Sequence, residues 1–372
     1  MAKFNIVCVS VGLLFFLHCQ QYCRGLDLKK CKFNRLYQLG DSSSDTGNYI
    51  RESANGAASA FARLPYGQTF FKKPTGRCSN GLLIIDYIAI ASGLAFIDPD
   101  RKTLFKVDFN NGDDFATAGA TALPDYVLKP KNISLPLTST SLEVQLDLMF
   151  THFNGICLVD CIELLKHSLF MVGEIGANDY SFALLQGKTI KETTSLVPDV
   201  VFEVQQAIRR VIEYGAVRIV VPGIFPLGCL PIHLTKFGTR NAAAYDEYQC
   251  LKYLNDLSIT HNQRLQRAIE EVKKENPKIT IVYGDYYNAY MALLRNAQRL
   301  RFDVKNLPKA CCGIGGKYNF DFKRTCGRRG VPVCADPERY ISWDGINLTQ
   351  QAYRIISQLL VRQILPELNC NA

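Results

Sequence analysis

Residues 35–48 read RLYQLGDSSSDTGN, and this stretch decides the fold. Its first five residues, Arg35–Leu39, are largely apolar and predict a short β-strand that ends at Gly40. A serine-rich polar turn follows, and the chain then enters a predicted helix start. A serine at such a turn exposes its hydroxyl near a helix N-terminus, which favours developing negative charge. Ser42 is therefore a candidate nucleophile, although from this stretch alone it is equally well explained as a helix N-cap.

Beyond this stretch, short apolar strands alternate with longer amphipathic helices. Strands are predicted at 168–173, 217–222 and 278–283, and helices at 82–91, 200–214, 245–274 and 348–365. The alternation predicts an α/β fold with a central, mostly parallel sheet flanked by helices. In such sheets ligands bind beyond the carboxyl ends of the strands. The chemistry is therefore expected at residues 40–42, 173–179 and 222–229.

The N-terminus predicts a secretory signal peptide over residues 1–24, because a short basic start precedes an apolar run at 6–17. That run is too short for a convincing membrane span, and no later stretch approaches roughly 18 uninterrupted apolar residues. A buried N-terminal helix is the alternative. Residues 25–372 are expected to form a single domain without a membrane span. The expected location is the secretory pathway: vacuole, endoplasmic reticulum or extracellular space.

Composition is that of an ordinary globular protein, with 48% hydrophobic and 21% charged residues among 372. The formal net charge of +9 allows an acidic partner, but the basic residues are spread along the chain. Short clusters such as Lys323-Arg324 and Arg328-Arg329 are best interpreted as solvated surface. No nucleic-acid-binding motif is present, so no nucleic-acid partner is expected.

The chain has 14 cysteines, of which Cys8, Cys19 and, depending on the cleavage position, Cys23 leave with the signal peptide. In an oxidising compartment most of the remaining eleven are expected to pair, and the odd number leaves one thiol over. These eleven are Cys31, Cys78, Cys157, Cys161, Cys229, Cys250, Cys311, Cys312, Cys326, Cys334 and Cys370. No zinc spacing appears, so no metal is expected. Residues 311–334 predict a disulfide-stapled loop near the last site segment.

Four further blocks follow in order: PYGQTFF at 65–71 with PTGR at 74–77, DFATAGAT at 114–121, GEIGANDY at 173–180, and WDGINLT at 343–349. Together with residues 40–48 they resemble the GDSL, or SGNH, family of serine ester hydrolases, in its plant branch. Through residues 37–41 the chain is most similar to the acetylajmalan-esterase-type alkaloid esterases. The resemblance implies a three-layer SGNH-hydrolase sandwich and no metal or organic cofactor.

The resemblance also implies roles for single residues. Ser42 matches the nucleophile, and its backbone N–H, the N–H of Gly119 and the side-chain amide of Asn178 match the oxyanion hole. Asp344 matches the acid that orients a histidine three residues later. The family's fifth block reads Asp-x-x-His, but this chain has Asn347 at the histidine position.

The asparagine removes the expected base. Imidazole serves as a base because its pKa lies near working pH, whereas a carboxamide has no comparable basicity. In a well-studied serine protease, loss of the triad histidine lowers turnover about a million-fold. The histidines of the mature chain are His152, His167, His233 and His261. Only His233, which follows a predicted strand at the expected active-site edge, is a candidate replacement.

The same asparagine creates a second N-glycosylation pattern. Asn347-Leu348-Thr349 and Asn132-Ile133-Ser134 both match the acceptor motif. We expect Asn132 to carry a glycan and Asn347 usually not, because folding buries Asn347 first.

Three functions remain open from the sequence. The first is a catalytically impaired member of the esterase family that binds, or helps to fold or traffic, an active relative. The second is an active serine esterase that removes O-acetyl groups from a small acyl ester such as a plant alkaloid. The third is binding of a wall polysaccharide or lipid without chemistry.

Overall fold

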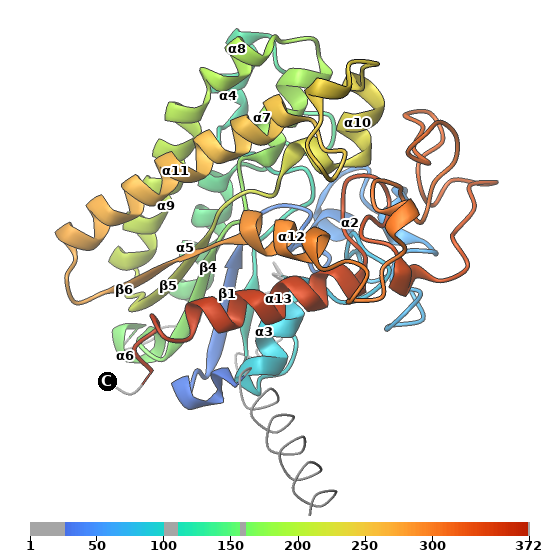
Figure 1. Cartoon of the computed structure of the whole chain (residues 1–372). Coiled ribbons are helices and arrows are strands. Elements are labelled where there is room, and N and C mark those ends of the chain that lie inside the picture. Colours follow the sequence, from blue (N-terminus) through green and yellow to red (C-terminus); the bar gives the residue numbers. More distant parts are fainter. Residues whose placement is uncertain (1–26, 100–110, 157–160, 371–372) are drawn as a thin grey trace, which may run out of the picture.

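The computed structural model describes residues 27–99, 111–156 and 161–370 (Figure 1). At its centre lies a six-stranded sheet in the order β2-β3-β1-β4-β5-β6, with every neighbouring pair parallel. The strands are β1 (Arg35–Leu39), β2 (Asp98–Pro99), β3 (Gly112–Asp114), β4 (Ser168–Val172), β5 (Arg218–Pro222) and β6 (Thr280–Gly284). The predicted α/β fold with a parallel central sheet is therefore confirmed.

Helices occupy most of the chain between the strands. The α-helices are α2 (Asn48–Glu52), α3 (Ile84–Ser92), α4 (Asp125–Leu128), α5 (Leu142–Ile156), α6 (Cys161–Leu165), α7 (Ala177–Leu185), α8 (Ile190–Thr194), α9 (Val197–Glu213), α10 (Pro231–Phe237), α11 (Lys252–Glu275), α12 (Tyr286–Arg295) and α13 (Gln350–Ile364). Single 3₁₀ turns lie at Leu28–Cys31, Ala60–Ala62, Lys129–Lys131, Leu227–Cys229, Ala242–Ala244, Val304–Asn306 and Pro337–Arg339.

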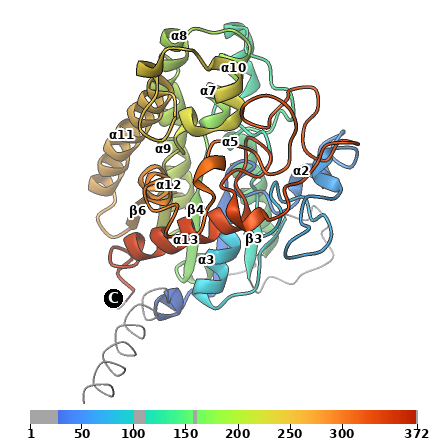
Figure 2. The same cartoon turned by 45° about the vertical axis from the view of Figure 1, so that its right-hand side comes forward.

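The helices cover both faces of the sheet and give three layers (Figures 1 and 2). Helices α5, α9 and α11 pack on one face, and α3, α12 and α13 pack on the other. All of β4 is buried because its alternate residues point to opposite layers. Phe170 and Val172 contact the first layer, whereas Leu169 and Met171 contact the second. This arrangement confirms the three-layer sandwich expected from the resemblance.

The long helix α11 begins later than predicted. The sequence predicts a helix from residue 245, but α11 starts at Lys252. In the intervening segment the Asp246 carboxylate accepts hydrogen bonds from the backbone N–H groups of Tyr248 and Cys250, both at 2.9 Å. A side chain that bonds to its own backbone offers an alternative to the helix, and here it turns the chain back on itself.

Cysteine pairing follows the expectation for an oxidising compartment. The disulfides in the described residues are Cys31–Cys370, Cys229–Cys250, Cys311–Cys334 and Cys312–Cys326. The last two confirm the stapled loop, which bonds through its backbone to Ser342 and Trp343 beside the fifth block. Cys78 is unpaired and buried.

Several expectations lie wholly or partly outside the described residues. The signal peptide at 1–24 and Cys157 belong to those segments, and the single-domain bounds 25–372 remain a prediction. Within the described ranges no helix combines the length and apolar character needed to cross a membrane. No group of three or more His, Cys, Asp or Glu side chains there is arranged around a metal position.

One buried carboxylate organises the turn after β1. The carboxylate of Asp45 accepts four backbone hydrogen bonds, from Gly47, Asn48 and Tyr49 at the start of α2 and from Ala118 in the third block, at 2.6–3.1 Å. Burial raises the pKa of Asp45 to about 6, although the four N–H donors oppose that shift. Asp45 therefore joins two segments that are 73 residues apart.

A second set of contacts reinforces this junction. The Asp114 carboxylate accepts hydrogen bonds from the backbone N–H and the hydroxyl of Thr46, at 2.7 and 2.8 Å. The Asn48 amide donates to the carbonyl oxygens of Asp114 and Ala116, at 2.7 and 2.9 Å. The polar residues of DTGN at 45–48 thus fix the third block against the first.

We predict that Asp45→Asn destabilises the fold by about 2–6 kcal/mol, because the new NH₂ group faces two buried N–H donors that each lose an acceptor. The free energy of unfolding in urea, with disulfides intact, measures this loss. Asp256→Asn on the exposed face of α11 is the matched control and is expected to change stability by less than about 0.5 kcal/mol. Equal effects of the two substitutions would contradict the role given to Asp45.

Candidate active site

Ser42 lies in a tight turn directly after β1. The backbone N–H groups of Ser44 and Asp45 donate to the carbonyl oxygen of Asp41, at 3.2 and 2.9 Å. Helix α2 begins only at Asn48, with Gly47 at its N-cap position. The interpretation of Ser42 as a helix N-cap is therefore wrong, because the Asp45 carboxylate binds the free N–H groups of that helix. The Ser42 side chain is partly exposed and makes no hydrogen bond within the described part of the chain.

A buried glutamine supports the turn after β1, and the sequence did not predict this role. Gln145 in α5 is completely buried, and its amide forms two hydrogen bonds with the backbone of Gly40. Gly40 N donates to Oε1 and Nε2 donates to Gly40 O, both at 2.8 Å. The only signal in the sequence is a polar residue on the apolar face of a helix. The clamp fixes the backbone two residues before Ser42.

The fourth block begins helix α7 and contacts the first and third blocks. The Asn178 amide nitrogen donates to Ala120 O at 2.9 Å and to Asp41 Oδ2 at 3.3 Å. These two acceptors are the chain neighbours of Gly119 and Ser42, so the structure brings together the three residues that match the oxyanion hole.

The next residue, Asp179, secures the same loop from the other side. Its carboxylate accepts the backbone N–H groups of Ala122 and Leu123, both at 2.9 Å. Burial raises the pKa of Asp179 to about 7. The Asn-Asp pair of the fourth block therefore places one side chain at the candidate site and one beneath it.

Two backbone donors stand free where an oxyanion hole is expected. Neither Ser42 N nor Gly119 N donates a hydrogen bond to any acceptor in the described residues. Gly119 has φ of +85°, and a Cβ atom there would lie 2.7 Å from the side chain of Leu137. A larger residue would therefore strain the backbone and meet Leu137.

The fifth block forms a closed hydrogen-bond cluster around Asp344. Its Oδ1 accepts Ile346 N and Asn347 N at 2.9 and 2.7 Å, and its Oδ2 accepts Asn347 Nδ2 at 3.0 Å. The Tyr66 hydroxyl, from the second block, also donates to Oδ2 at 2.9 Å. Burial raises the pKa of Asp344, and these four donors oppose the shift. Asn347 is buried, at 5% exposure.

None of the described histidines bonds to Ser42, Asp344 or Asn347. His233 is fully buried, its Nδ1 lies 2.8 Å from Leu227 O, and burial lowers its pKa to about 4. His261 is buried against Tyr180, and His152 is paired with Asp113. His167 is exposed directly before β4, at the opposite end of that strand from the fourth block.

A cavity of 940 Å³ adjoins this cluster. Asp344 and Ile346 line it on one side, together with Leu137, the residue that packs against Gly119. Residues within 49–66 and 320–329 form the remainder of its wall. The fifth block therefore borders a space of the size that small-molecule sites usually have, and Leu137 lies between that space and Gly119 of the third block.

Comparison with known proteins agrees with this geometry. The model of the GDSL-like Lipase/Acylhydrolase family matches residues 36–360. The chain is 45% identical to Acetylajmalan esterase 2 of Rauvolfia serpentina, over 92% of this chain and 93% of that protein. It is 42% identical to a GDSL esterase/lipase of Arabidopsis thaliana, over 92% of each chain. The resemblance inferred from the five blocks is confirmed, and the chain belongs to the GDSL-like lipase/acylhydrolase family.

Proposed function

We propose that this member of the family is catalytically impaired and uses its retained site to bind an ester ligand. The observation that carries the proposal is the 3.0 Å hydrogen bond from Asn347 Nδ2 to Asp344 Oδ2. The amide N–H takes the place that an imidazole N–H would take against the acid. The remaining polar atom of the side chain is a carbonyl oxygen, which accepts a hydrogen bond but does not take a proton.

The binding half of the site supports the proposal. Ser42 N and Gly119 N are free to donate to the carbonyl oxygen of an ester or to a tetrahedral oxyanion. Asn178 gives its amide hydrogens to Ala120 O and Asp41 Oδ2. To join the other two donors it would release the longer bond, that to Asp41 at 3.3 Å.

The histidines support impairment. His233, the candidate replacement base, would have to give up its bond to Leu227 O and leave a fully buried position to reach Ser42. Its pKa, lowered to about 4 by burial, makes it a weak base at neutral pH. An active esterase that removes O-acetyl groups remains the alternative outcome of the experiment below.

We extend the proposal to a role as a binding, folding or trafficking partner of an active relative. The disulfides and the plant relatives fit a protein of the secretory pathway, where such a pair would meet. A pull-down of the tagged chain from its native tissue is expected to recover a family member with the histidine in place. Recovery of no such relative speaks against the partner role.

We predict that Asn347→His raises ester hydrolysis at least about a hundredfold, because Nδ1–H can donate to Asp344 while the other ring nitrogen acts as the base. Release of p-nitrophenol from p-nitrophenyl acetate, measured for purified wild type and variant, checks this. Adding Ser42→Ala to the variant is expected to abolish the gain.

Asn347→Gln is the matched control, because it keeps an amide at this position without basicity, and it is expected to stay as inactive as wild type. The proposal fails if the wild-type chain already hydrolyses the ester and Ser42→Ala stops it. His233→Ala then becomes the next variant to assay.

We also predict that the secreted protein carries a glycan on Asn132 and none on Asn347. Asn132 is exposed, whereas Asn347 is buried and bonded to Asp344. Peptide mapping by mass spectrometry measures occupancy of both sites. Asn132→Gln is expected to remove the glycan mass and Asn347→Gln to leave it unchanged. A glycan found on Asn347 would overturn this prediction.

A further inference from the structure

The cavity beside Asp344 has an aromatic wall. Tyr49, Phe61, Tyr66 and Phe320 line it. The rings of Tyr49 and Phe61 meet edge to face at 5.8 Å, and those of Phe61 and Tyr66 at 5.1 Å. Rings held in this way offer a fixed apolar surface, against which an aromatic group of a ligand packs in offset or edge-to-face geometry.

The same cavity is lined by five basic residues: Arg63, Lys323, Arg324, Arg328 and Arg329. Arg324 is paired with Asp321 at 3.2 Å. The other four form no ion pair with an acidic residue in the described chain. The lining contains one acidic residue, Asp344, which is buried and already accepts four hydrogen bonds.

Two disulfides hold the basic residues in place. Four of the five lie in the stapled loop 311–334, coloured orange to red at the right of Figure 1. Cys326 is itself part of the cavity wall, and its bond to Cys312 anchors the segment that carries Lys323–Arg329. Cys312 N in turn donates to Trp343 O at 2.7 Å, directly before Asp344. The backbone that carries these basic residues is thus tied to the chain next to Asp344.

We propose that the ligand of this cavity is a small ester that combines an aromatic group with a negative charge, such as a carboxylate. The inference rests on the proposed function, in which the adjoining donors hold the ester carbonyl. The aromatic wall would pack against the ring, and the unpaired arginines would attract the anion. A protonated alkaloid amine, the class suggested by the narrower family resemblance, would instead meet four charges of its own sign.

The test measures binding separately from catalysis, on Ser42→Ala protein that cannot turn the probes over through this serine. Three aryl acetates carry an anionic, a neutral and a cationic para position: 4-carboxyphenyl acetate, phenyl acetate and 4-(trimethylammonio)phenyl acetate. Titration calorimetry at low ionic strength is expected to give the carboxylate at least about tenfold higher affinity than the cation, with the neutral ester between them. Added salt is expected to narrow the difference.

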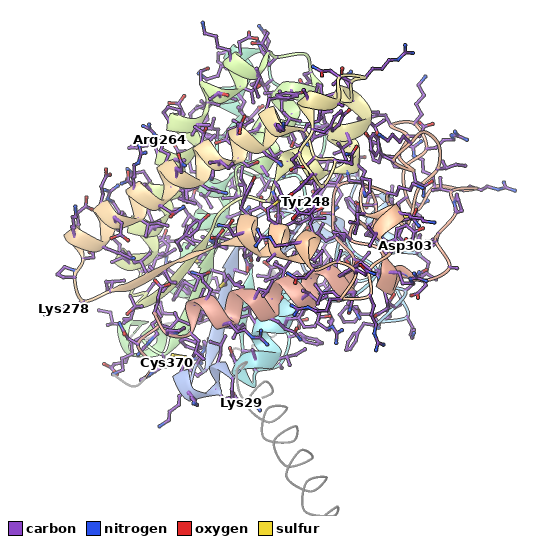
Figure 3. All side chains as sticks on the ribbon, viewed as in Figure 1. Lys29, Tyr248, Arg264, Lys278, Asp303 and Cys370 are labelled. Atoms are coloured by element: carbon purple, nitrogen blue, oxygen red, sulfur yellow. A yellow bond between two sulfur atoms is a disulfide. The ribbon has the colours of Figure 1, made fainter. Side chains whose placement is uncertain are left out.

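Charge reversal identifies the residues. Arg328→Glu with Arg329→Glu is expected to weaken binding of the carboxylate about tenfold or more and to remove its advantage over the cation. The matched control is Arg264→Glu with Arg267→Glu, which changes net charge equally at exposed positions of α11 outside the cavity lining. Figure 3 labels Arg264 on that helix. The control is expected to stay within about twofold of the parent.

The remaining outcomes separate this inference from the proposed function. Equal binding of the three probes, no binding of any, or an equal effect of the two charge reversals would each overturn the inference. Hydrolysis by Asn347→His without charge preference would leave the proposed function standing and the anionic ligand refuted. Selective binding of the carboxylate, together with an inactive Asn347→His, would support the anionic ligand and refute the proposed function.

Discussion

The Asp45 carboxylate is the interaction on which the candidate site depends. Parallel strands place their carboxyl ends at one edge of the sheet, but they do not fix the loops that follow those ends. Asp45 does so, because its two oxygens receive N–H groups from the start of α2 and from the third block. With those donors occupied, the turn at Ser42 and the loop at Gly119 keep their own N–H groups free. The N–H groups of Ser42 and Gly119 thus stay available because Asp45 accepts the hydrogen bonds of neighbouring N–H groups.

An imidazole combines two properties in a site of this kind. One ring nitrogen donates a hydrogen bond to the acid, and the other nitrogen takes up and returns a proton. Asn347 retains the first, since its amide bonds to Asp344 as a ring N–H would, and lacks the second. Tyr66 supplies a further donor to the same oxygen, so the buried acid is well solvated by the protein without a histidine. These contacts explain how the cluster around Asp344 is ordered with an asparagine at position 347.

The sequence predicts much of this structure because its signals are local. Arg35–Leu39 is observed as β1 without change, and the first, third and fourth blocks follow the ends of β1, β3 and β4. β2 and β3 escaped prediction, since two or three residues carry too little periodicity. Gln145 and the basic residues that line the cavity were not predicted for another reason. Lys323-Arg324 and Arg328-Arg329 look like solvated surface in sequence, and only the folding of residues 49–66 against the stapled loop gathers them at one cavity.

The Cys31–Cys370 disulfide joins residues 339 positions apart and makes most of the chain a covalent ring. Such a crosslink restricts the unfolded ensemble, and the effect grows with the length of the closed loop. The ring has a further consequence for proteolysis. A protease that cuts one loop between Cys31 and Cys370 releases no fragment, because the disulfide still joins the two pieces.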